Sequence, residues 1–100
     1  MQIDEVYFSA LPLGSGFVRC AHGRLPVPAP GALELLRGVP VYQTDTRGEL
    51  VTPTGAAIVK VLASGYGPMP RMTLERIGYG AGTKDFDEHP NLLRVCIGQR

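Results

Sequence analysis

The chain has 100 residues, 44% of them hydrophobic, with 13 glycines, nine prolines and a formal net charge of +1 at pH 7. This length suits a single domain, and because the glycines and prolines cluster at turns, the composition argues against a disordered tract. The basic residues are scattered, which argues against a nucleic-acid partner, and no apolar run is long enough to span a membrane. Residues 1–5 include two acids and lack the basic start of a signal sequence, so we expect a cytoplasmic protein.

The first part of the chain predicts a strand followed by a hairpin. Residues 6–10 alternate between apolar and polar side chains, which is typical of a half-buried strand, and Pro12 is expected to end it. Residues 17–21 and 24–27 flank Gly23, which can supply the positive φ of a tight turn. The second arm carries prolines and is therefore expected at a sheet edge.

A two-turn helix and a second hairpin are predicted next. Pro30 suits the first helical position, residues 31–37 continue the helix, and Gly38 is the expected C-cap. Leu33 and Leu36 are spaced to face the core. Residues 39–44 then read as a brief strand, which a turn over residues 45–48 would reverse into residues 49–51.

A longer helix begins after Thr52, which has the position of an N-cap with Pro53 following it. Its apolar stripe, at i, i+3 and i+4, consists of Ile58, Val61 and Leu62. Residues 72–79 and 92–97 read as two further strands, separated by a long connection. The order of elements predicts an α+β domain: an antiparallel or mixed sheet of about five to six short strands with two helices on one face.

Three segments rich in Gly and Pro follow strand-like runs and are interpreted as shaped turns, where binding sites tend to lie. They span residues 12–16, 52–55 and 78–83. The helix start could bind an anion through the hydroxyls of Thr52 and Thr54 and through free amides near Gly55. Simple capping of the helix by Thr52 is the favoured alternative, and Glu49 nearby would repel a phosphate.

The glycine-rich segment is a second candidate site for a phosphate or substrate. Its candidate residues are Gly78, Tyr79, Gly80, Gly82 and Thr83, with Tyr79 as a stacking surface. No apolar helix follows, so the dinucleotide-binding and P-loop interpretations fail. A strand that ends in a bulge is the favoured alternative.

Metal chemistry has only weak support. Cys20 and His22 lie two residues apart, so on a strand they would share a face, with ligands that suit nickel, zinc or copper. Two ligands do not make a site, and an ordinary hairpin-turn histidine is favoured. Cys20 and Cys96 are expected to be buried thiols rather than a disulfide.

Four blocks of this sequence closely resemble the LarC family of nickel-insertion proteins. They are PLGSG at 12–16, HG at 22–23 with PVPAP at 26–30, ELVTPTGAA at 49–57, and IGYGAG at 77–82; Asp85 and residues 90–95 are also similar. The resemblance implies part of a lyase that uses CTP and manganese to place nickel in pyridinium-3,5-bisthiocarboxylic acid mononucleotide, forming the nickel-pincer cofactor. Family members are several times longer, so the resemblance implies that this chain is an internal fragment, one domain over residues 1–100, of a homo-oligomeric protein.

The CTP site of that family is associated with a C-terminal domain, so no nucleotide-binding or manganese-binding residue is carried over to this chain. An alternative is a non-catalytic scaffold that joins the flanking catalytic and nucleotide-binding domains. Ile3, Leu11 and Met69 would then lie in exposed apolar patches. A stand-alone phosphate-ligand sensor is less favoured, because the sequence has no obvious output element.

Overall fold

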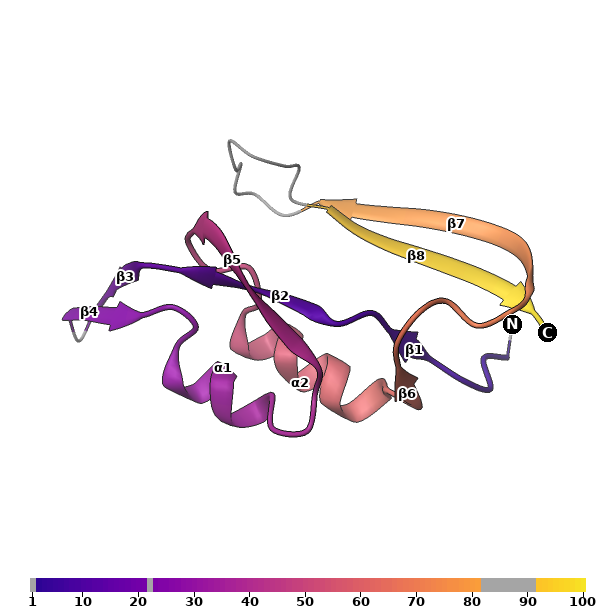
Figure 1. Cartoon of the computed structure of the whole chain (residues 1–100), viewed down its shortest axis with the longest axis horizontal. Helices are drawn as coiled ribbons and strands as arrows, with labels where there is room; N and C mark the ends of the chain where they lie inside the picture. The colour runs from indigo at the N-terminus through magenta and orange to yellow at the C-terminus, as the bar shows by residue number, and fades with distance from the viewer. Residues whose placement is uncertain (1, 22, 82–91) are drawn as a thin grey trace. The chain divides into compact units, whose positions relative to one another are not determined.

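The computed structural model of the chain describes residues 2–21, 23–81 and 92–100. It divides into two compact units, Met1–Met69 and Pro70–Arg100. Both helices lie in the first unit, and strands occur in both units (Figure 1). The predicted α+β class is confirmed, and the strands mix parallel and antiparallel pairs.

The strands pair in four two-stranded sheets. In the first unit, β1 (Tyr7–Phe8) pairs in parallel with β6 (Gly65–Tyr66), and β2 (Leu11–Ser15) pairs in parallel with β5 (Val41–Arg47). The short strand β6 was not among the predicted elements. Parallel pairing requires a crossover between the two strands, and α1 lies between β2 and β5 in the chain, as α2 lies between β5 and β6.

The prediction that Pro12 ends the first strand is wrong, because β2 runs from Leu11 through Pro12 to Ser15. The amide of Leu11 donates to the carbonyl of Pro40, next to β5, at 3.0 Å. Successive amides of a strand point to opposite sides, so the nitrogen of Pro12 faces away from β5 and no ladder bond is lost. The turn predicted over residues 12–16 is limited to Gly16, whose φ is +91°.

The second predicted hairpin is also wrong, because β5 continues to Arg47 and residues 49–51 form no strand. The residue before the predicted turn and the last residue of that turn bond instead to β2. Thr44 donates its hydroxyl to the carbonyl of Leu13 at 2.8 Å, and Gly48 donates its amide to the carbonyl of Ser15 at 3.1 Å. Pairing with a strand remote in sequence therefore overrode the local turn signal.

The first predicted hairpin is confirmed. Strands β3 (Phe17–Cys20) and β4 (Gly23–Pro26) are antiparallel, with Phe17 opposite Pro26. Gly23 has a φ of +105°, as the turn chemistry requires. The guanidinium of Arg24 lies 4.6 Å from the centre of the Phe17 ring, a cation–π contact across the two strands.

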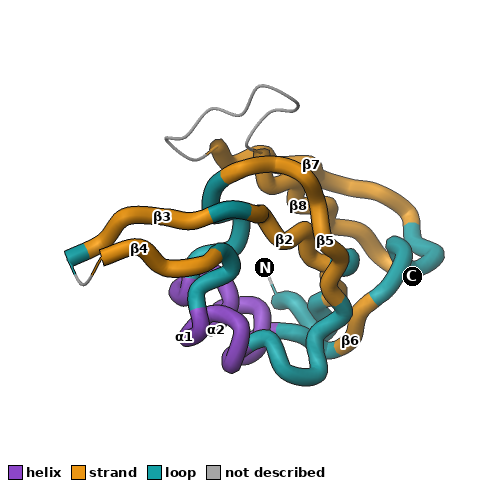
Figure 2. The backbone as a smooth tube through the Cα atoms, turned by 60° about the vertical axis from the view of Figure 1, so that its left-hand side comes forward, coloured by secondary structure: helices purple, strands orange, loops and turns teal. Residues whose placement is uncertain are grey.

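Helix α1 (Pro30–Leu35) begins at Pro30 as predicted. The prediction that Gly38 is its C-cap is wrong, because the C-cap is Leu36 and Gly38, with a φ of +81°, lies two residues further on. Leu36 is buried, as expected, but Leu33 is 48% exposed. Ala32 takes the buried place one turn before Leu36. Figure 2 shows α1 beside α2 (Pro53–Leu62), and the two helices are in contact.

The core of the first unit lies between β2 and the two helices. Its buried residues are Leu13, Leu36, Val39, Ala56 and Val59, and partly buried Phe8, Leu11, Val51 and Tyr66 pack against them. The apolar stripe predicted along α2 does not join this core. Ile58, Val61 and Leu62 are 51%, 82% and 52% exposed, because α2 turns its Ala56 and Val59 face inward.

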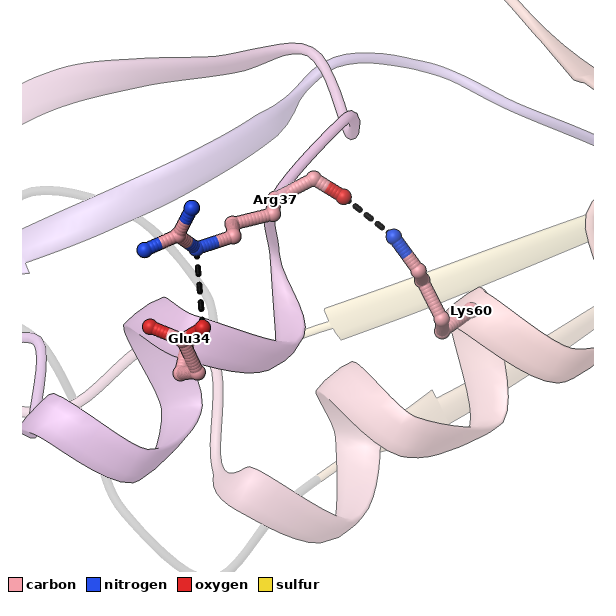
Figure 3. A network of polar contacts seen from close by, with 3 residues as sticks. All are labelled: Glu34, Arg37 and Lys60. Atoms are coloured by element: carbon pink, nitrogen blue, oxygen red, sulfur yellow. Dashed lines mark hydrogen bonds and ion pairs between the residues drawn. The ribbon is translucent and has the colours of Figure 1, made fainter.

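A polar contact joins the two helices (Figure 3). The ammonium group of Lys60 in α2 donates to the carbonyl oxygen of Arg37, just beyond the end of α1. The negative end of the α1 dipole also attracts a cation at this position. Arg37 forms a 2.8 Å ion pair with Glu34. Both side chains are exposed, so the ion pair contributes little to stability.

The second unit contains one antiparallel hairpin, formed by β7 (Thr73–Ala81) and β8 (Leu92–Gln99). Both strands were predicted, and each extends two residues further than expected at its C-terminal end. The register shifts between Leu74 and Arg76, so the bulge lies near the start of β7. Gly78 to Ala81, predicted as part of a turn or a terminal bulge, are regular strand residues.

Candidate functional site

The start of α2 is a capped helix N-terminus. The hydroxyl oxygen of Thr52 accepts the amide of Gly55 at 3.0 Å, and the Thr52 carbonyl accepts the amide of Ala56 at 2.9 Å. Pro53 has no amide hydrogen, so Thr54 offers the remaining free amide of this turn among the described residues. This geometry supports the capping interpretation of Thr52 and leaves the amide and exposed side chain of Thr54 for a ligand.

The glycine-rich segment lies on β7. Gly78 and Gly80 have no positive φ, and a Cβ atom on either would have no atom within 4 Å among the described residues. Neither glycine is therefore required by the backbone conformation or by packing in the described part of the chain. Tyr79, between them, is 66% exposed. Gly82 and Thr83 lie outside the described residues.

Of the two candidate metal ligands, one lies within the described residues. Cys20 is the last residue of β3, and His22 lies outside the described residues. Cys96 is partly exposed, so the prediction that it is buried is wrong. Within residues 2–21, 23–81 and 92–100, no group of three or more His, Cys, Asp or Glu side chains could hold a metal ion. The described residues therefore do not fit a manganese site, and we assign no step of a reaction to manganese on them.

The outward face of α2 is an open apolar surface. Its residues are Ala57, Ile58, Val61 and Leu62. Ile3 and Met69 are also exposed, at 51% and 56%, whereas Leu11 packs against the core. Two of the three residues predicted in exposed patches are therefore exposed, and α2 carries a further exposed apolar face.

The two predicted binding segments belong to different units. Thr52, Thr54 and Gly55 lie in the first unit, whereas Gly78, Tyr79 and Gly80 lie in the second. Arg94, which is directly opposite Tyr79 on β8, was not predicted as a site residue. The sequence shows that side chains alternate between two faces along residues 92–97, but it does not show which residue of the other strand lies opposite Arg94. Among the described residues, no helix has the length and apolar content to cross a membrane.

Comparison with known proteins gives one family. A family model described as nickel insertion protein matches residues 1–100. A protein of Geobacter sulfurreducens, provisionally named nickel insertion protein, is 60% identical over 97 residues, which are 97% of this chain and 25% of that protein. A protein of Dictyoglomus thermophilum with the same provisional name is 56% identical over 99 residues, 99% of this chain and 25% of that protein.

A third relative has a more specific name. The pyridinium-3,5-bisthiocarboxylic acid mononucleotide nickel insertion protein of Desulfitobacterium hafniense is 56% identical over 97 residues, 97% of this chain and 24% of that protein. The chain thus spans about a quarter of the length of these relatives. No solved structure matches the chain significantly.

Proposed function

Because this chain belongs to the nickel insertion protein family, we propose that it forms part of an enzyme that inserts nickel into pyridinium-3,5-bisthiocarboxylic acid mononucleotide. The observation that carries the proposal is the 56% identity, over nearly the whole chain, to a relative named for that reaction. Nickel is the metal delivered, so it is a substrate. The product would be the nickel-pincer nucleotide, with the metal held by soft sulfur donors and a ring carbon.

We further propose, from the family resemblance, that the reaction is a CTP-dependent lyase reaction that requires manganese and takes place in the cytoplasm. CTP and manganese would be bound by flanking domains of a longer, homo-oligomeric protein, of which this chain is one internal domain. Sizing of the full-length protein by light scattering tests the oligomeric state, and a monomer would contradict it.

The activity is tested by incubating the full-length protein with the mononucleotide, Ni²⁺, CTP and Mn²⁺, and measuring nickel in the product by mass spectrometry. We expect the nickel-containing product only in the complete mixture. Product formed without CTP or without manganese would contradict that requirement and leave nickel insertion standing. No product from the complete mixture would overturn the proposed function.

Two substitutions test whether the predicted segments contact the substrate. Thr54→Glu adds a negative charge in the first turn of α2, where the helix dipole favours it, so the fold is retained while an anionic ligand is repelled. Gly80→Val places a side chain on β7 where a Cβ would meet no described atom within 4 Å, and valine suits a strand. We expect both variants to lose nickel insertion and to keep their circular dichroism spectrum; unchanged activity would contradict these contacts.

The alternative function is a non-catalytic scaffold that joins the flanking domains. The exposed apolar face of α2 favours it, since a helix face of this kind usually packs against another surface. If the chain is a scaffold, Val61→Lys will weaken assembly of the full-length protein, whereas Thr54→Glu and Gly80→Val will leave activity unchanged. Amide shifts confined to residues 52–55 and 78–81 on addition of the mononucleotide would favour the enzyme proposal instead.

A further inference from the structure

The register of the β7–β8 hairpin places different side chains on its two faces. Tyr79 is opposite Arg94, and Ile77 is opposite Cys96, so these four residues share one face. Gly78 is opposite Val95 and Gly80 is opposite Leu93 on the other face, which also carries Arg76. We refer to the first as the Tyr79 face and to the second as the glycine face.

On the Tyr79 face, an aromatic ring and a guanidinium are neighbours. Side chains directly opposite each other in an antiparallel pair have Cβ atoms about 4.5–5.5 Å apart. Both side chains are exposed, Tyr79 at 66%. A flat ring and a fork of N–H donors are therefore presented side by side.

Neither Tyr79 nor Arg94 forms an ion pair or a cation–π contact with another described residue. The described residues contain no carboxylate within ion-pair distance of Arg94, and Arg24 over Phe17 is the cation–π contact they form. The strands β7 and β8 carry a single carboxylate, Glu75, which lies at the bulge four residues before Tyr79. The surroundings of Arg94 on the two strands therefore favour an anion.

We propose that the Tyr79–Arg94 pair binds the mononucleotide substrate, with the pyridinium ring stacked on Tyr79 and the phosphate held by Arg94. This inference rests on the proposed function and adds to it a phosphate-binding residue and a face of the hairpin. An electron-rich phenol ring attracts a cationic ring through its face, and a guanidinium binds phosphate through two parallel hydrogen bonds. The substrate carries both groups, separated by one ribose, which suits two neighbouring side chains.

The hairpin provides a matched control for each residue. Arg76 is an exposed arginine on β7 whose register position is on the glycine face, so Arg76→Ala removes the same charge from the same hairpin. Tyr79→Phe keeps the ring and Tyr79→Leu removes it.

The experiment measures the Kd of the mononucleotide for the full-length protein by calorimetry, together with the KM values for the mononucleotide and for CTP. We expect Arg94→Ala to raise the Kd about tenfold or more, and Tyr79→Leu to raise it about tenfold. Arg76→Ala and Tyr79→Phe should each change it less than about threefold. The KM for CTP should stay unchanged in all four variants.

The possible outcomes separate this inference from the proposed function. If the unsubstituted protein inserts nickel but Arg94→Ala and Arg76→Ala bind the mononucleotide equally well, the inference is wrong and the function stands. A raised KM for CTP in Arg94→Ala, with the mononucleotide Kd unchanged, also overturns it. If the unsubstituted protein neither binds the mononucleotide nor inserts nickel, both are overturned. Should Arg94→Ala lose its native circular dichroism spectrum, Arg94→Gln, which keeps the length of the side chain, decides by the same criteria.

Discussion

Gly14 of β2 lies so close to Gly48, the residue after β5, that a Cβ atom on Gly14 would overlap the carbonyl oxygen of Gly48. The register of the β2–β5 pair is irregular at this point, between Leu13 and Ser15. Two hydrogen bonds hold the strands together here. The side-chain amide of Gln43 donates to the Gly14 carbonyl at 3.0 Å, and the amide of Gly48 donates to the Ser15 carbonyl at 3.1 Å. The backbones approach closely because Gly14 has no side chain.

Gly14→Ala is therefore expected to destabilise the first unit by about 2 kcal/mol or more, since the obstacle is backbone and cannot rotate away. Urea unfolding followed by circular dichroism measures this change. Gly31→Ala in α1 is the control, because its Cβ would meet no atom within 4 Å and alanine favours a helix. The control should be neutral or stabilising by up to about 1 kcal/mol, and equal midpoints for the two variants would contradict the close approach.

The Thr52 hydroxyl stabilises the start of α2, so Thr52→Ala should cost about 1 kcal/mol. Thermal unfolding should show a decrease of several degrees in Tm, as expected for a domain of this size. Thr52→Ser keeps the hydroxyl and should restore most of the loss. If serine and alanine at this position gave the same Tm, the bond to the Gly55 amide would have no part in stability.

Val59 and Val61 are the same residue type on opposite sides of α2, with exposed fractions of 8% and 82%. Val59→Ala should destabilise the protein by about 1–3 kcal/mol, because it removes two methyl groups from the core and leaves a cavity. Val61→Ala should change the free energy of unfolding by less than about 0.5 kcal/mol. Denaturant midpoints of the two variants provide the comparison, and the opposite order would show that the Ile58, Val61 and Leu62 stripe faces the core.

Gly98 and Gly78 test the packing of the second unit. A Cβ on Gly98 would overlap the carbonyl oxygen of Thr73 and lie 2.9 Å from the Met72 sulfur, whereas a Cβ on Gly78 would meet no atom of the described residues within 4 Å. Gly98→Ala should therefore increase amide hydrogen exchange along β7 and β8 in the full-length protein. Gly78→Ala should leave that exchange unchanged or slower, and equal protection in both variants would contradict the predicted difference.

Most of what the sequence predicted correctly depends on chemistry within a few residues. The β3–β4 hairpin follows from Gly23 and its flanking strands, and the start of α2 follows from the Thr52–Pro53 pair. The β7 and β8 strands follow from their apolar content. Each of these signals is local, so it survives without knowledge of the rest of the fold.

The errors have one cause, which is that remote partners decide pairing and burial. Parallel pairing with β2 carried β5 through a segment that favours a turn, and it tolerated Pro12 because the proline nitrogen faces away from β5. On the helices, Ala32 and Ala56 are fully buried while the larger residues of the predicted stripe are exposed. Small side chains let two helices approach closely, so the most apolar face is not the one that packs inside.

For the candidate site, the sequence by itself determined which chemical groups are available: the capped helix start, the glycines and the ring of Tyr79. Only the tertiary structure decided that Arg94 is the neighbour of Tyr79 and that Arg76 lies on the other face. The physical reason is that a strand presents alternate residues to opposite faces, so the bulge near Glu75 and the pairing across a long connection set which side chains meet.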